Sequence, residues 1–233
     1  MSKLVWNIII LSVFVVADNC QIDRNGFLYK GKCINGKANG YGQMISNEKN
    51  LYDFYEKYDG QFKNGKPHGQ GKFQYSKNSF YEGQFQNGES HGKGVFVFEY
   101  ANKVYRGEFK NGYRHGLGST TIDGKLFEKG EFDRNALKKG LKHMYSGSKY
   151  KYSGSIYKGE FFDGYPSEVG TAKYVNGDTY SGQWRGGNCH GKGMYIRNNG
   201  RVIEGTFYFG DYVYNNQIKI KGLCDKEKFW RGE

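Results

Sequence analysis

Short stretches of the chain alternate between aromatic or glycine residues and polar residues. In the segment 81–86, Tyr, Gly and Phe alternate with Glu and Gln, and the alternation resumes at 92–98 after the segment NGESH. Successive side chains of a strand point to opposite faces, so this pattern predicts two strands with one apolar and one solvated face. NGESH, which ends in His91, is predicted to be the turn between them. The stretch therefore predicts a β-hairpin.

The hairpin pattern recurs along most of the chain. With the first residue of Y-x-G-x-aromatic as the repeat mark, copies begin at Tyr29, Tyr58, Tyr81, Tyr105, Glu128, Tyr157, Tyr180 and Ile203. Most marks lie about 23 residues apart, and fixed self-similarity of this length indicates a repeat architecture. Two longer intervals predict loops between Gly42 and Tyr58 and between Phe132 and Tyr157, with insertions near 43–57 and 133–156. The fifth and eighth units are degenerate.

Glycine recurs on the same predicted strand face as the rings, although glycine normally weakens a strand. We expect a ring from the neighbouring hairpin to lie flat over the bare glycine backbone. Asn-Gly pairs at Asn64, Asn87 and Asn111 supply residues that accept positive φ in the connections. The residues with this predicted structural role are Tyr58, Gly60, Phe62, Tyr81, Gly83, Phe85, Tyr105, Gly107, Phe109, Tyr157, Gly159, Phe161, Tyr180, Gly182 and Trp184.

The combined motif Y-x-G-x-[FW]-x-x-G-x-x-H-G-x-G resembles the MORN repeat (membrane occupation and recognition nexus). Full matches begin at Tyr58, Tyr81, Tyr105 and Tyr180. The resemblance implies an all-β fold, an elongated, twisted single-layer antiparallel array of successive hairpins over residues 29–211. Such a rod needs atypical ends, so we expect an N-terminal cap at 18–28 and a C-terminal cap at 212–233. MORN relatives serve in cytoskeletal, ciliary and membrane-junction assemblies.

The N-terminal segment is typical of a secretory signal peptide. A single early cation, Lys3, precedes an apolar run, and small residues at Val15 and Ala17 suit cleavage after Ala17. An uncleaved membrane anchor and a buried strand are the alternatives. In an oxidising compartment Cys20 would pair with Cys33, and Cys189 with Cys224. The alternative is four reduced thiols.

The sequence offers little support for catalysis, and we expect no enzyme activity, cofactor or metal site. Four histidines, at 68, 91, 115 and 190, stand ten residues after their repeat marks. Equivalent positions in adjacent hairpins lie about 9.5 Å apart, too far for shared zinc coordination, so we interpret them as turn residues. The run GGNCHGKG resembles a phosphate loop, but it lacks the following Ser or Thr and the helix.

One segment departs from the repeat. Residues 134–158 carry seven Lys or Arg and no acid, with four tyrosines interleaved. This composition allows two interpretations: a docking patch for anionic lipid head groups, acidic protein or polyanionic glycan, and a solvated insertion loop whose charge aids solubility. The predicted patch consists of Arg134, Lys138, Lys139, Lys142, Lys149, Lys151 and Lys158.

The formal net charge of +12 and the 18% aromatic content describe a basic, folded chain. We predict a non-catalytic scaffold that presents an extended β surface to protein partners, its own copies included. The alternative is a peripheral binder of anionic lipid head groups or acidic partners through residues 134–158. Nucleic acid is not expected as a partner, because no nucleic-acid-binding module is recognisable.

Overall fold

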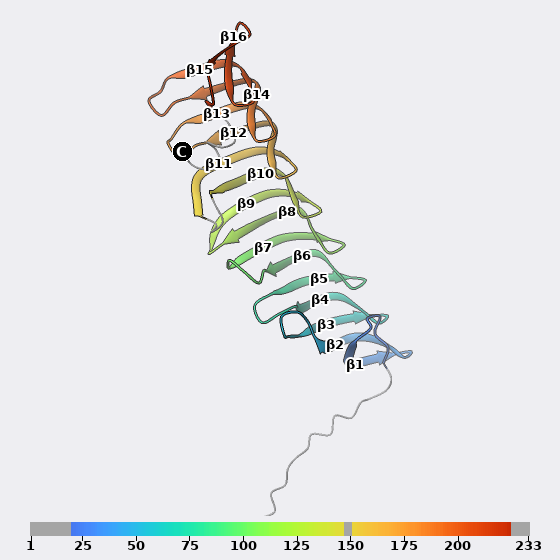
Figure 1. Cartoon of the computed structure of the whole chain (residues 1–233). Helices are drawn as coiled ribbons and strands as arrows, with labels where there is room; N and C mark the ends of the chain where they lie inside the picture. Colours follow the sequence, from blue (N-terminus) through green and yellow to red (C-terminus); the bar gives the residue numbers. More distant parts are fainter. Residues whose placement is uncertain (1–19, 147–150, 225–233) are drawn as a thin grey trace, which may run out of the picture.

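The computed structural model describes residues 20–146 and 151–224, with the side chains of residues 145–146 and 151–153 left aside. These residues form one elongated antiparallel sheet, in which strands that are consecutive in sequence pair with each other (Figure 1). The described ranges contain no helix. The all-β hairpin array predicted from the repeat is therefore confirmed.

The strands pair as eight hairpins, β1–β2 to β15–β16, followed by a final strand, β17. Their bounds are β1 Phe27–Ile34, β2 Lys37–Lys49, β3 Tyr55–Lys63, β4 Lys66–Gln74, β5 Phe80–Gln86, β6 Glu89–Val97, β7 Lys103–Lys110, β8 Tyr113–Ile122, β9 Lys125–Asp133, β10 Ala136–Ser146, β11 Lys151–Phe162, β12 Tyr165–Lys173, β13 Thr179–Arg185, β14 Asn188–Ile196, β15 Val202–Tyr208, β16 Asp211–Tyr214 and β17 Gln217–Ile220.

The hairpin turns are shorter than the sequence suggested. Asn64 and Gly65 alone connect β3 to β4, with φ values of 52° and 87°. Two successive residues with positive φ are typical of a type I′ turn, whose twist matches that of the flanking strands. Asn87 and Asn111 occupy the same position with φ near 50°. The predicted role of the Asn-Gly pairs is thus confirmed.

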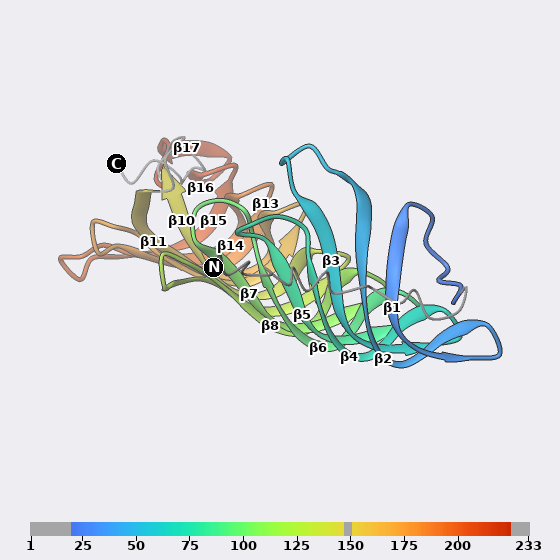
Figure 2. The ribbon, with the colours of Figure 1, turned by 90° about the horizontal axis from the view of Figure 1, so that it is seen from below.

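The predicted loops at the two long intervals are mostly strand, and this expectation was wrong. In the first interval, β2 extends to Lys49 and β3 begins at Tyr55. In the second, residues 136–146 are β10, the second strand of a fifth hairpin, and β11 begins at Lys151. The extra residues lengthen strands, so that the connected ends of β2 and β3 rise above their neighbours (Figure 2).

Glycines form a continuous ladder across the sheet, from Gly31 on β1 to Gly205 on β15. Each is paired in register with a glycine on the next strand, as Gly71 is with Gly60 and Gly83. A Cβ built on Gly71 would lie 2.3 Å from the hydroxyl of Tyr58. In most hairpins the glycines are therefore required because a tyrosine ring covers them. The covering ring belongs to the same hairpin, not to the neighbouring one as expected.

The rings join adjacent hairpins in a zigzag. Tyr58 contacts Phe62 of its own hairpin and Phe85 of the next, both at 5.0 Å between centroids and both edge-to-face. Tyr81 repeats this geometry with Phe85 and Phe109, at 5.0 and 4.8 Å. Such pairs contribute about 0.5–1.5 kcal/mol beyond burial. This aromatic face is the core of the protein, and each unit contacts only its neighbours.

Both ends of the array are tied to their caps. Cys20 is bonded to Cys33 and Cys189 to Cys224, with Cα atoms 5.8 and 5.9 Å apart. The structure thus contains the predicted pairing rather than four thiols. At the C-terminal end, the N–H of Cys224 also donates to the carbonyl of Gly210 in the last hairpin turn, at 3.0 Å. Residues 1–19, with the predicted signal peptide, lie outside the described residues.

Candidate interaction surfaces

A double bulge in most of the hairpins explains the second half of the motif. Between the pairs Gly60–Gly71 and Phe62–Pro67, one residue of β3 faces three residues of β4. Gly69 lies in this bulge with φ of 75°, a conformation that favours glycine. The preceding His68 lies in strand β4, and His91, His115 and His190 are placed likewise. The interpretation of the histidines as turn residues was therefore wrong.

Two side chains satisfy the backbone groups that the bulge leaves unpaired. The hydroxyl of Tyr81 donates to the carbonyl oxygens of Gln84 and His91, at 2.8 and 3.2 Å. On the opposite face, Oε1 of Gln84 accepts the N–H of Lys93 at 2.9 Å. Burial raises the pKa of the Tyr81 hydroxyl above its usual range. Sequence reasoning missed the role of Gln84, which alternation alone marked as an ordinary solvated residue.

One row of the aromatic face is interrupted by polar residues. The row, named here the aromatic row, crosses the sheet in register and consists of Tyr29, Met44, Tyr58, Phe73, Tyr81, Phe96, Tyr105, Thr120, Glu128, Lys142, Tyr157, Ala172, Tyr180, Tyr195 and Ile203. All of its members are aromatic or apolar except Thr120, Glu128 and Lys142. These three are adjacent and lie at the middle of the array.

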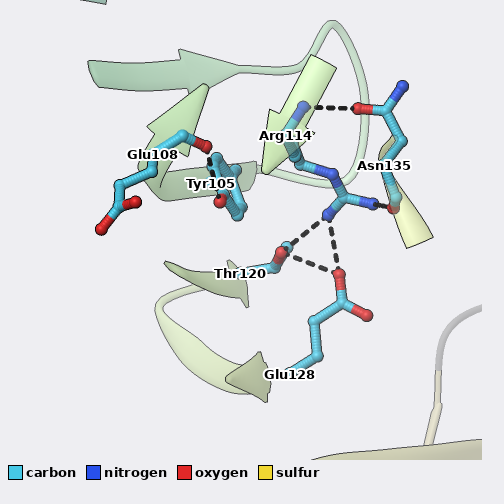
Figure 3. A network of polar contacts seen from close by, with 6 residues as sticks. All are labelled: Tyr105, Glu108, Arg114, Thr120, Glu128 and Asn135. Carbon is cyan, nitrogen blue, oxygen red and sulfur yellow. Dashed lines mark hydrogen bonds and ion pairs between the residues drawn. The ribbon is translucent and has the colours of Figure 1, made fainter. Parts of the chain in front are cut away.

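Arg114 completes this polar interruption (Figure 3). Its guanidinium pairs with the Glu128 carboxylate at 2.8 Å, and Thr120 donates to the same oxygen at 2.9 Å. The side chains of Arg114 and Glu128 are only 15% and 7% exposed. The guanidinium also lies over the rings of Tyr105 and Phe132, at 5.2 and 4.9 Å from their centroids. In the sequence, Glu128 stands at a repeat mark where most other units have tyrosine. This departure from the repeat could have revealed the ion pair.

Two half-buried lysines flank the ion pair on the same face. Lys142 lies opposite Glu128 in register, with its ammonium 5.6 Å from the Phe127 ring and 5.9 Å from the Phe161 ring. Lys103 lies over Phe98 at 4.6 Å. Burial lowers the pKa of both lysines; Arg114 lowers it further, while the Glu128 carboxylate opposes the shift.

The predicted basic patch is divided by the sheet. Lys139 and Lys158 lie on the polar face, where Lys139 approaches the carboxylate of Glu160 at 3.6 Å. Lys142 lies on the aromatic face. Arg134 occupies the β9–β10 turn and Lys138 is exposed on β10. Lys149 and the side chain of Lys151 lie outside the described residues. The structure therefore does not gather the described members into one patch.

Exposed aromatic side chains mark the turns of the C-terminal hairpins. Phe162 and Tyr165 flank the β11–β12 turn, and Tyr208 and Phe209 lie at the β15–β16 turn; these four residues are named the tip patch. Phe162 is 74% exposed and Tyr208 60%. The corresponding residues of the second hairpin are the lysines at positions 63 and 66. Sequence reasoning missed this difference, because alternation does not distinguish turn-flanking residues.

Two features are absent from residues 20–146 and 151–224. There, no three His, Cys, Asp or Glu side chains come together as potential metal ligands. The same residues include no helix that is long and apolar enough to cross a membrane.

A family model for the MORN repeat matches five segments, residues 58–80, 81–99, 105–122, 157–179 and 180–200. These are the second, third, fourth, sixth and seventh hairpins. The chain is a MORN-repeat protein, as the motif resemblance predicted. No curated protein matches the sequence. The first, fifth and eighth hairpins are also antiparallel and lack parts of the motif; the first has the same bulge as the matched ones, the fifth a shorter bulge and the eighth none in its described pairing.

Proposed function

We propose that this protein is a non-catalytic scaffold that presents its extended β surface to protein partners. MORN repeats indicate a role in binding or scaffolding. The tip patch supports the proposal most directly, because four large aromatic side chains lie exposed at turns within one third of the array. Exposed aromatic residues near an arginine are typical of protein interfaces, and Arg185 lies 5.8 Å from the Phe209 ring.

A pair of matched variants tests this proposal. Phe162→Ser with Tyr165→Ser removes two exposed rings, whereas Lys63→Ser with Lys66→Ser changes the equivalent positions of the second hairpin. We expect the first variant to lose partners that the wild type captures from its native organism, and the second to retain them. Unchanged melting temperatures would show that both variants fold. Equal capture by all three proteins would contradict the assignment of the tip patch.

The second candidate function is peripheral binding of anionic lipid head groups. It is supported by the exposure of Lys138, Lys139 and Lys158, but Glu160 lies beside Lys139 and reduces the local charge. Sedimentation with phosphatidylserine vesicles distinguishes the two candidates. A scaffold does not depend on anionic lipid, whereas a lipid binder sediments with these vesicles at low salt and is released at high salt.

We further propose that the protein enters the secretory pathway. The two disulfides support an oxidising compartment, and the N-terminal sequence is typical of a cleaved signal. Intact-mass measurement of protein from a eukaryotic secretory host tests this. A mature chain beginning at Asp18 is expected, and retention of Met1 in the secreted product would contradict cleavage.

A further inference from the structure

One hairpin turn contains a phenylalanine where the other turns have a polar residue or glycine. Phe209 begins the β15–β16 turn with φ of 48°, and Gly210 follows with φ of 95°. The residues at the first position of the other seven hairpin turns, all with positive φ, are Asn35, Asn64, Asn87, Asn111, Arg134, Asp163 and Gly186. This left-handed conformation is unfavourable for a bulky side chain, and residues strained in this way cluster at functional sites. Folding alone does not explain a phenylalanine at this position.

The turn that contains Phe209 is held from two sides. The N–H of Gly210 donates to the carbonyl of Cys189 at 2.9 Å, and the carbonyl of Gly210 accepts the N–H of Cys224 at 3.0 Å. The disulfide between Cys189 and Cys224 joins these two partners to each other. A strained conformation persists where the surrounding structure determines it in this manner. The turn is therefore pre-organised before any partner binds, which reduces the entropic cost of binding.

Three side chains contact the ring of Phe209. The ring centroids of His190 and Tyr208 lie 4.8 and 5.0 Å from it, and the guanidinium carbon of Arg185 lies at 5.8 Å. His190 also lies 5.5 Å from Tyr208. These four residues form one contiguous group across β13, β14 and the β15–β16 turn, and they are named the Phe209 cluster.

The charge of the cluster belongs to Arg185. Asp163 and Asp211 stand in the two neighbouring turns, but within residues 20–146 and 151–224 no acidic side chain forms an ion pair with Arg185. Oδ1 of Asp211 instead accepts the N–H of Gly222 at 2.6 Å. Burial lowers the pKa of His190, and the charge of Arg185 lowers it further, so this ring is neutral at pH 7. The cluster thus combines a neutral aromatic surface with one guanidinium that lacks a carboxylate partner.

We propose that the Phe209 cluster binds an extended segment of a partner protein in which an acidic and an apolar residue stand two positions apart. The site rests on the scaffold function proposed above and gives the tip patch a chemical class of partner. The guanidinium of Arg185 can donate two parallel hydrogen bonds to a carboxylate, while Tyr208 and Phe209 cover the apolar side chain. In an extended chain, side chains two positions apart share a face at about 6.5 Å. This spacing is close to the 5.8 Å between the Arg185 guanidinium and the Phe209 ring.

The charges at the turns favour a protein segment over a lipid surface. Attraction to anionic head groups depends on accumulated positive charge, but Asp163 and Asp211 flank the single cation, Arg185, along the row of turns. A bidentate contact with one carboxylate requires only one guanidinium in a defined position. Aromatic and arginine side chains together are also typical of the residues that contribute most to protein–protein binding.

Fluorescence anisotropy of two labelled peptides with the full chain tests the site. In the spaced peptide, one glutamate and one phenylalanine stand two positions apart in a glycine–serine background; in the adjacent peptide they are neighbours. The test variant is Arg185→Gln and its control is Arg106→Gln, because both arginines are exposed on strands. We expect Arg185→Gln to bind the spaced peptide about tenfold more weakly and Arg106→Gln to change by less than about threefold. The wild type should prefer the spaced peptide by at least about threefold.

A second variant, Phe209→Asn, separates binding from folding. It restores the residue that begins four other turns, and asparagine tolerates the left-handed conformation. We therefore expect its thermal midpoint to equal or exceed that of the wild type, although it binds the spaced peptide about tenfold more weakly. The control is Tyr113→Asn, which removes an exposed ring beside the β7–β8 turn and should leave peptide binding unchanged.

Several outcomes would overturn the proposal. They are no binding of the spaced peptide by the wild type, equal binding of the two peptides, equal weakening by Arg185→Gln and Arg106→Gln, and unchanged binding by Phe209→Asn. Sedimentation with phosphatidylserine vesicles that depends on Arg185 and Phe209, without peptide binding, would assign the cluster to a membrane instead. Partner capture that is still lost in the Phe162→Ser with Tyr165→Ser variant would leave the scaffold proposal standing.

Discussion

The hydroxyl of Tyr81 donates to the carbonyl oxygen of Gln84, three residues further along the same strand, at 2.8 Å. The same contact joins Tyr58 to Gln61 and Tyr180 to Gln183. Each tyrosine thus covers the glycine pair of its hairpin and satisfies a carbonyl at the bulge. The repeat depends on tyrosine at this position because phenylalanine supplies only the first of these two functions.

Removing the Tyr81 hydroxyl tests this dependence. Tyr81→Phe leaves the partly buried carbonyls of Gln84 and His91 without their donor, so we expect a loss of about 1–3 kcal/mol in the free energy of unfolding. Phe85→Tyr is not a suitable control, because it adds a hydroxyl to the core. Exposed Tyr113→Phe is suitable, and it should change stability little in urea denaturation. Equal effects of the two substitutions would count against the hydrogen-bonding role.

Adding one methyl group to the glycine ladder should also destabilise the protein. In Gly71→Ala the new Cβ lies within 2.6 Å of the Tyr58 ring, and overpacking of this kind costs about 1–3 kcal/mol. A cooperative decrease in the thermal midpoint is the expected result. The control is Gln70→Ala, one residue away on the polar face. If Gly71→Ala melted like the wild type, the ring would have to lie elsewhere.

Alkaline pH should unfold the array through its buried tyrosines. Burial raises the pKa of Tyr105 from 10.0 to about 12, and it raises the pKa of Tyr58, Tyr81 and Tyr157 as well. The unfolded chain therefore releases these protons at lower pH than the folded one, so stability is complete below pH 10.0 and falls above it. Urea midpoints measured across this range should decrease with increasing pH. A constant midpoint would contradict the burial of these hydroxyls.

The Arg114–Glu128 ion pair should be costly to break and inexpensive to replace. Glu128→Ala leaves Arg114 buried without its carboxylate, and we expect a loss of about 3–5 kcal/mol. Restoring the repeat with Arg114→Ser and Glu128→Tyr should be neutral or stabilising, since Ser90 and Tyr105 occupy these positions in neighbouring units. Denaturant titration compares both variants with the wild type. A restored variant as unstable as Glu128→Ala would show that the ion pair stabilises this junction.

Much of the architecture is predictable from sequence because its determinants are local. Alternation defines the strands around Tyr81, and the Asn-Gly pair at Asn87 defines the turn. The second strand of the fifth hairpin, β10, was expected to be a loop for a specific physical reason. Its bulge contains one extra residue instead of two, between the pairs Leu137–Phe132 and Lys139–Glu131. Gly140 consequently comes one residue early, and the motif no longer matches.

The interaction surfaces were less predictable, because they depend on which strand face each residue occupies. The lysines of 134–158 form one run in the sequence, but Lys139 and Lys142 lie on opposite faces of β10. Arg114 and Glu128 are 14 residues apart and meet only through the register of β8 and β9. Counting the charged residues of a sequence segment therefore predicts neither the separation of Lys139 from Lys142 nor the Arg114–Glu128 ion pair.

Continuity of the array through the fifth hairpin is the central claim, and amide hydrogen exchange of the full chain measures it most directly. If residues 137–144 form β10 between β9 and β11, their amides should be protected as strongly as those of β6, because exchange requires opening of a paired strand. Protection of β9 and β11 with rapid exchange throughout 137–144 would contradict the claim. That result would divide the molecule into two shorter arrays joined by a loop.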